Sequence, residues 1–194
     1  MMSNDLHLDR FEVRLSGLGG QGILTLGRIM GQALALDHGY EVTQTQSYGP
    51  EARGGASRCD LVISTGKISY PKTICLDLLV SLSQEACNKY FGDLKTEGFL
   101  LVDTSLVGQT PTNIFWGLPF TTMAQKVGLV QTTNIVALGA LTHFIPFMRA
   151  TSVRKSLKEI LPQKIVDINI KAFNSGFNRA KKEYPEAPEK WKFS

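Results

Sequence analysis

Apolar and polar residues alternate along residues 11–16 (FEVRLS), a pattern typical of a β-strand. A glycine-rich turn follows, and apolar residues then recur at helical spacing through residues 23–34. Gly39 ends this helix, and the β-branched residues within 40–46 predict a second strand. The chain therefore opens with a strand–helix–strand unit.

Apolar runs continue the predicted sheet through the middle of the chain. Residues 76–82 and 99–102 are apolar enough for buried strands, with a short helix between them at residues 84–91. Residues 113–116 are expected to add an edge strand. The same sheet thus extends beyond the first unit.

A β-hairpin is expected between these two parts of the sheet. Two short runs with strand-like composition, 59–64 (CDLVIS) and 67–74 (KISYPKTI), flank the dipeptide Thr65-Gly66. This pattern predicts a hairpin added to the α/β core.

Helical spacing dominates the second half of the chain. Residues 119–128 predict one helix, begun by proline and closed by glycine. Residues 133–144 predict another, capped by Thr132 or Thr133, and residues 165–180 predict an amphipathic last helix. The second of these helices has small residues that would permit close packing: Ala137, Gly139 and Ala140.

These elements predict a three-layer α/β fold, with a mixed or mostly parallel sheet flanked by helices and an added β-hairpin. The chain has 194 residues, which fits a single domain over residues 1–194. Its 43% hydrophobic and 20% charged residues are typical of soluble domains. No run approaches the ~18 apolar residues of a membrane span, and the polar start MMSNDLHLDR is unlike a signal peptide. A cytoplasmic protein without membrane association is expected.

Charge is unevenly distributed along the chain. Residues 149–194 contain 11 Lys and Arg against 5 Asp and Glu, so they carry a net charge of +6, and the remainder of the chain carries −2, which together give the net +4. No aromatic–basic module or zinc pattern accompanies these charges, which disfavours nucleic-acid binding. A solvated or partner-facing helix explains them better.

The residue types that build an active site are scattered. Cys59, Cys75 and Cys87 lack the close spacing of cluster or zinc ligands, so buried free thiols are expected and no metal site is predicted. Asp77 and Asp103 occupy strand positions without a visible partner and are interpreted as structural. Without a nucleophile elbow, a Walker lysine or an acid–base pair, no catalytic residue can be assigned. The chain is expected to be a subunit that is not active alone.

The glycine-rich turn at residues 17–22 (GLGGQG) is the first candidate binding site. It matches G-x-G-x-x-G between a strand and a helix, where backbone N–H groups can approach a phosphate. The second strand ends in Thr43-Gln-Thr-Gln46 without the acidic residue that holds a ribose, so NAD specificity is unsupported. The alternative is that the glycines only permit a tight turn and close packing.

The loop at residues 47–55 (SYGPEARGG) is the second candidate. Arg53 and the glycines after it could present a guanidinium and open backbone to an anion, and Tyr48 offers a flat ring. Alternatively, Glu51 and Arg53 could pair at a subunit contact. The candidate cofactor-binding residues are therefore Gly17, Gly19, Gly20, Gln21, Gly22, Tyr48, Arg53, Gly54 and Gly55.

Three segments together resemble the gamma subunit of 2-oxoacid:ferredoxin (acceptor) oxidoreductases. They are residues 17–23 (GLGGQGI), 47–55 (SYGPEARGG) and 134–140 (NIVALGA). The loop is especially similar to that of the 2-oxoglutarate type. Residues 1–10 and the tail after Lys182 fall outside the resemblance.

The resemblance implies an enzyme complex that oxidatively decarboxylates a 2-oxoacid to its acyl-CoA. The complex is expected to use thiamine diphosphate, iron–sulfur clusters and coenzyme A, with none of these cofactors held by this chain alone. The implied partners are alpha and beta subunits, a delta subunit as a further candidate, and ferredoxin or a similar acceptor. A homodimer of the isolated chain is left open.

Two functions from other classes remain as alternatives. A stand-alone nucleotide-binding oxidoreductase would use the turn at residues 17–22, and an RNA-binding protein would use the basic tail. The absent acidic residue counts against the first and the absent aromatic module against the second.

Overall fold

The computed structural model describes residues 8–47 and 55–186. Within these residues, six strands form one sheet in the order β2-β3-β1-β4-β5-β6. Strand β3 runs antiparallel to β1 and β2, whereas β1, β4, β5 and β6 are parallel, so the sheet is mixed. The strands are β1 (Phe11–Leu18), β2 (Glu41–Ser47), β3 (Ala56–Ser64), β4 (Leu76–Ser81), β5 (Leu94–Asp103) and β6 (Trp116–Leu118).

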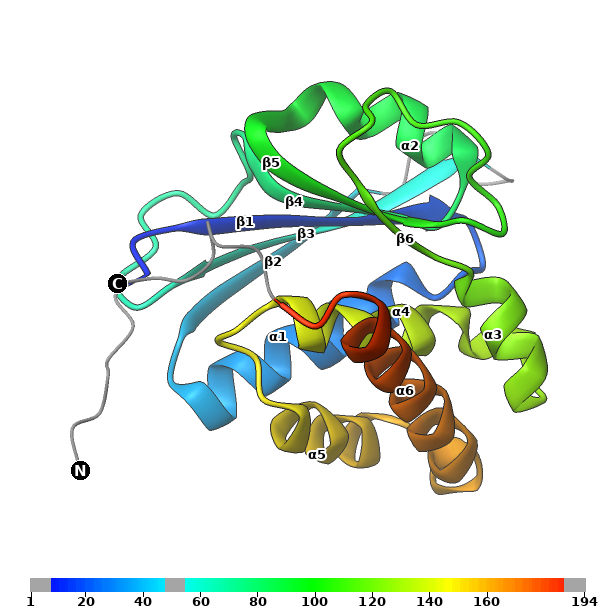
Figure 1. Cartoon of the computed structure of the whole chain (residues 1–194). Helices are drawn as coiled ribbons and strands as arrows, with labels where there is room; N and C mark the ends of the chain where they lie inside the picture. Colours follow the sequence, from blue (N-terminus) through cyan, green and yellow to red (C-terminus); the bar gives the residue numbers. More distant parts are fainter. Residues whose placement is uncertain (1–7, 48–54, 187–194) are drawn as a thin grey trace.

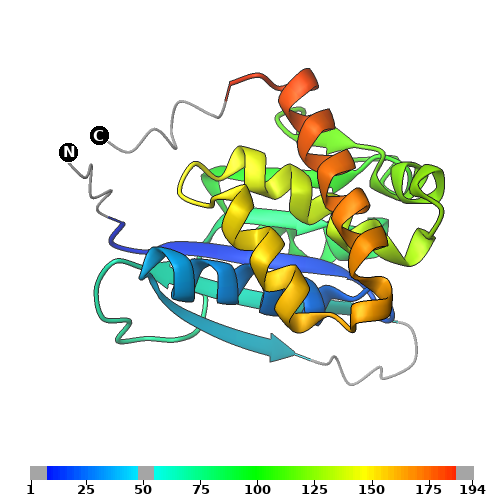
Figure 2. The same ribbon diagram turned by 90° about the horizontal axis from the view of Figure 1, so that it is seen from below.

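Helices cover both faces of the sheet, which gives the three predicted layers (Figure 1). Helix α2 lies on one face and the longer helices on the other, with α5 and α6 outside α1 and α4 (Figure 2). None of the described helices is long and apolar enough to cross a membrane. The helices are α1 (Ile23–His38), α2 (Gln84–Tyr90), α3 (Phe120–Val127), α4 (Thr133–Phe144), α5 (Ala150–Ile160) and α6 (Gln163–Glu183), with short 3-10 helices η1 (Phe91–Asp93) and η2 (Val130–Thr132).

Helix α4 is the centre of the larger core. It is buried on nearly all sides because it lies between the sheet and α6. Its crossing with α6 is made by glycines: a Cβ atom at Gly139 would overlap the carbonyl oxygen of Phe173, and one at Gly176 would overlap that of Val136. The close packing expected from Gly139 is therefore confirmed.

The predicted hairpin around Thr65-Gly66 does not form, so this prediction is wrong. Residues 67–74 form no strand, and β3 pairs instead with β2 and β1. Arg10, the residue before β1, binds the backbone of this segment by donating to the carbonyl oxygens of Tyr70 and Lys72 at 2.9 and 2.7 Å. Backbone groups held by side chains do not need a strand partner.

Most other predicted elements are confirmed, with four differences. Strand β5 begins at Leu94, five residues before the predicted apolar run, and Thr132, the N-cap residue of α4, makes no side-chain capping hydrogen bond. Strand β6 begins only at Trp116, the last residue of the expected edge strand. Helix α5 was not predicted, because its buried face is narrow and partly polar: Val153 and Leu157 are buried together with Ser152 and Ser156.

Candidate functional site

The glycine turn connects β1 to α1 and contains two glycines with left-handed backbone conformation. Gly20 and Gly22 have φ angles of 90° and 70°, which glycine adopts at no steric cost. Gly22 is the N-cap of α1, no side chain caps the helix, and its first turn contains no acidic residue. The N–H groups and positive end of α1 are therefore available to a negatively charged group.

Gln21 holds the turn in shape. Its Oε1 accepts a hydrogen bond from the backbone N–H of Leu18 at 2.6 Å, and its Nε2 donates to the carbonyl oxygen of Leu82 at 3.0 Å. Leu82 immediately follows β4, so the side chain joins the ends of two neighbouring parallel strands. Its amide is thus directed into the protein, which suits a residue that orients the turn.

Asn134, in the first turn of α4, holds the glycine turn through a hydrogen bond to its backbone. Its Nδ2 donates to the carbonyl oxygen of Gly22 at 3.0 Å, while its buried Oδ1 has no hydrogen-bond partner within the described residues. A Cβ atom at Gly22 would overlap this amide. Residues 17–23 and 134–140, two of the segments that carry the family resemblance, therefore meet in space.

A cavity of about 310 Å³ opens beside the turn. Cβ atoms placed on Gly19 or Gly20 would meet nothing within 4 Å, so the backbone there can be approached closely. The pairing of β1 with β3 brings residues 57–58 to the same cavity. Arg58 is a described cation at this site that was not predicted from the sequence, although it stands only three residues after the candidate loop.

The second candidate loop lies mostly outside the described residues. Tyr48, Arg53 and Gly54 belong to the part that the structure does not describe, whereas Gly55 immediately precedes β3. Both described ends of the loop lie near the glycine turn, because β3 pairs with β2 and with the end of β1. The convergence of Arg53 and the turn on one anion stays a prediction.

The other candidate residues have structural contacts. Asp103 is fully buried and accepts hydrogen bonds from the backbone N–H groups of Ser105 and Thr121 at 2.9 and 3.0 Å. Asp77 accepts from Lys95 Nζ at 2.7 Å. Burial raises the pKa of Cys59 to about 12, so this thiol stays protonated and unreactive at neutral pH.

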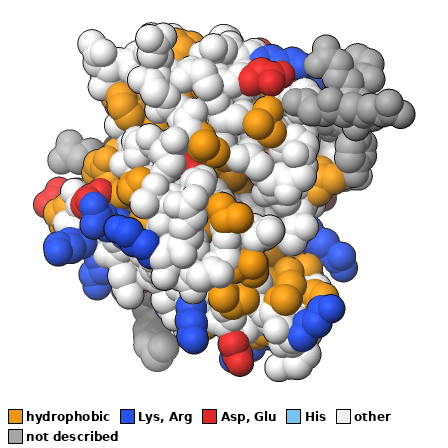
Figure 3. All heavy atoms as spheres, turned by 90° about the vertical axis from the view of Figure 1, so that its right-hand side faces the viewer, with side chains coloured by type: hydrophobic (Ala, Val, Ile, Leu, Met, Phe, Trp, Pro, Cys, Tyr) orange, Lys and Arg blue, Asp and Glu red, His pale blue; other side chains and the backbone are white. Residues whose placement is uncertain are grey.

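The face at the carboxyl ends of the parallel strands also exposes apolar surface. Figure 3 shows hydrophobic side chains spread over it from the middle to the lower part. Leu106, shortly after β5, and Val130, shortly before α4, are each 43% exposed. Exposed apolar side chains gathered on one face suit a surface that another protein covers.

Comparison with known proteins identifies relatives over nearly the whole chain. The model of the pyruvate ferredoxin/flavodoxin oxidoreductase family matches residues 12–179. The chain is 44% identical to the 2-oxoglutarate synthase subunit KorC of Methanocaldococcus jannaschii, covering 89% of this chain and 95% of the relative. It is 39% identical to KorC of Methanothermobacter marburgensis, covering 86% and 95%.

Solved structures agree with this result. The keto/oxoacid ferredoxin oxidoreductase gamma subunit from Geobacter sulfurreducens is 39% identical, with a TM-score of 0.79 over 89% of this chain and 99% of that chain. The 2-oxoglutarate:ferredoxin oxidoreductase from Magnetococcus marinus has a TM-score of 0.82 at 22% identity, over 93% of this chain and 32% of that chain, and shows the shared fold. The resemblance seen in the sequence is confirmed.

Proposed function

The chain belongs to the pyruvate ferredoxin/flavodoxin oxidoreductase family, and we propose that it is the gamma subunit of a 2-oxoglutarate:ferredoxin oxidoreductase. The proposal rests on the KorC relatives, which this chain matches over nearly their full length. The complex would remove carbon dioxide and an electron pair from 2-oxoglutarate. The acyl group would form a thioester with coenzyme A, and the electrons would reduce ferredoxin or a similar acceptor.

The chemistry would be divided between subunits. Within the described residues, no group of His, Cys, Asp or Glu side chains could hold a metal ion. As the family resemblance implies, thiamine diphosphate and the clusters would be bound by alpha, beta and delta partners, in the cytoplasm. This chain would supply a binding surface and would show no 2-oxoacid oxidation by itself.

The surface offered by this chain suits the phosphates of coenzyme A. The observation that carries this role is the open, uncapped glycine turn at the positive end of α1, with Arg58 beside its cavity. The helix end contributes roughly 0.3 to 1 kcal/mol to anion binding when exposed. A charge-assisted hydrogen bond contributes about 1.5 to 3 kcal/mol. Arg53 would add a second such donor if its loop turns toward the same site.

Gly19→Ala in the assembled complex tests this role. Gly19 has no positive φ and faces open space, so alanine fits the free protein but places a methyl group where the phosphate would approach. We expect the KM for coenzyme A to rise about tenfold, with unchanged subunit stoichiometry in gel filtration. Gly108→Ala is the matched control, because that glycine is equally open and lies outside the cavity lining. Equal KM values for both variants and the wild type would reject the ligand role and favour a subunit contact.

A further inference from the structure

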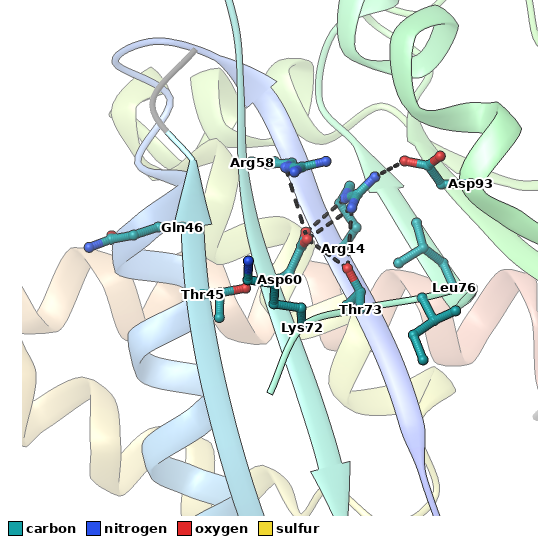
Figure 4. A pocket seen from close by; sticks show the side chains of 10 residues that line it. Arg14, Thr45, Gln46, Arg58, Asp60, Lys72, Thr73, Leu76 and Asp93 are labelled. Carbon is teal, nitrogen blue, oxygen red and sulfur yellow. Dashed lines mark hydrogen bonds and ion pairs between the residues drawn. The ribbon is translucent and has the colours of Figure 1, made fainter. Parts of the chain in front are cut away.

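A second cavity, of about 420 Å³, lies on the α2 side of the sheet over β1, β2 and β3. Strand register builds its floor, because Asp60 of β3 pairs with Arg14 of β1 and with Thr45 of β2. Directly paired residues point to the same face of a sheet, so these three side chains form a polar row. Figure 4 shows this row together with Arg58, Lys72 and Thr73.

Arg14 engages both carboxylates of the pocket. Its Nε and Nη2 donate to the two oxygens of Asp60 at 2.7 and 2.8 Å, and its Nη1 donates to Asp93. Thr73 Oγ1 adds a hydrogen bond to Asp60 at 2.8 Å. Burial lowers the pKa of Arg14, but the bonds and charges of Asp60 and Asp93 outweigh burial and hold that pKa above its usual value. This network forms the floor of the pocket, and both of its carboxylates already accept hydrogen bonds from Arg14.

Two further cations, Arg58 and Lys72, line the pocket, and Arg58 lies beside the Tyr90 ring and within ion-pair distance of Asp60. The distance from Arg58 Nε to Asp60 Oδ2 is 3.9 Å, too long for a hydrogen bond. Lys72 extends over the floor with its ammonium toward Thr45 (Figure 4), and in the described part of the chain that ammonium has no ion-pair partner. The lining therefore contains three cations against two carboxylates, a net charge of +1.

We propose that this polar pocket binds a phosphate monoester of the same ligand whose pyrophosphate approaches the glycine turn. Arg58 lines both cavities, so the two cavities are neighbours and can be occupied by two groups of one ligand. The Arg58 guanidinium, the Lys72 ammonium and the Thr45 hydroxyl together form a donor set suited to phosphate. The inference rests on the proposed role in coenzyme A binding, since coenzyme A carries a 3′-phosphate separate from its pyrophosphate.

The test compares coenzyme A with 3′-dephospho-coenzyme A, titrated into the assembled complex by isothermal calorimetry. The wild type is expected to bind coenzyme A about tenfold or more tightly than the dephospho form, the size of one charge-assisted hydrogen bond. Lys72→Gln should remove most of this preference by weakening coenzyme A binding alone. Thr45→Val, which removes only a hydroxyl, should reduce the preference less. Lys67→Gln is the control, because Lys67 is exposed nearby but does not line the pocket.

Each outcome separates this inference from the proposed function. Equal affinity of the wild type for both ligands, or an unchanged preference in both Lys72→Gln and Thr45→Val, would overturn the phosphate pocket. If Gly19→Ala still weakens both ligands in that case, the glycine-turn role stands. A wild-type complex that binds neither ligand would overturn both proposals.

Discussion

Two pairs of glycines in this chain serve opposite purposes. Gly139 and Gly176 lie where α4 crosses α6, and each brings backbone against backbone with no room for a Cβ atom. Gly19 and Gly20 lie at the end of β1, where a Cβ atom would meet nothing within 4 Å. The first pair lets the two helices pack closely, and the second pair leaves the backbone accessible. The same residue type therefore marks a packing contact in one place and a candidate ligand contact in the other.

The largest loss of stability is expected from Gly176→Ala, at the contact between α4 and α6. The new methyl group would overlap the carbonyl oxygen of Val136, which cannot move without shifting α4. Overpacking typically costs about 1 to 3 kcal/mol, and a clash with backbone should lie at the upper end, near 3 kcal/mol. Urea unfolding of the full chain measures this loss, with Gly108→Ala as an open-glycine control. A loss of stability no larger than that of the control would show that α4 and α6 can separate easily.

Gly22→Ala should cause an intermediate loss of stability, because Gly22 lies in the glycine turn and is also packed closely against a side chain of α4. Its positive φ of 70° would cost alanine about 1 to 2 kcal/mol. Its Cβ would also displace the Asn134 amide and weaken a hydrogen bond worth about 1 kcal/mol. We expect a total loss of roughly 2 kcal/mol.

The double variant Gly22→Ala/Asn134→Ala separates the two causes. Because removal of the Asn134 side chain relieves the overlap, the double variant should lose less stability than the sum of the two single variants. Strict additivity in a double-mutant cycle would mean that only the backbone strain matters.

The sequence predicted the elements whose apolar pattern is regular. The strand, glycine turn and helix at the start, the buried β4 and β5, and helices α3, α4 and α6 all have clear periodicity or terminal glycines and prolines. Residues 67–74 misled the prediction, because their strand-like composition is overridden by side-chain contacts from Arg10 and Glu12. Such contacts depend on residues about 60 positions away and leave no local pattern.

The site was predictable only in part for the same reason. The glycine turn was visible as a motif, but its support by Asn134 spans 112 positions and the polar row depends on strand register. Arg14 looks like an ordinary polar residue of an alternating strand, although it is buried in an ion-pair network. Arg58 comes close to the glycine turn only because β1 and β3 pair. Pairings of this kind belong to the tertiary structure.

The smallest effect on stability is expected from Gly19→Ala at the open pair. Its backbone is outside the positive-φ region and its surroundings are empty, so alanine should fit without strain. A compatible Gly→Ala change stabilises a protein by about 0.4 to 1 kcal/mol, since the unfolded chain loses freedom. Urea unfolding should show this small gain even though the same change raises the KM for coenzyme A in the complex. A variant that is destabilised by more than 1 kcal/mol, about the size of the expected gain but opposite in sign, would show that Gly19 is a packing glycine like Gly176, and the contrast between the two pairs would be lost.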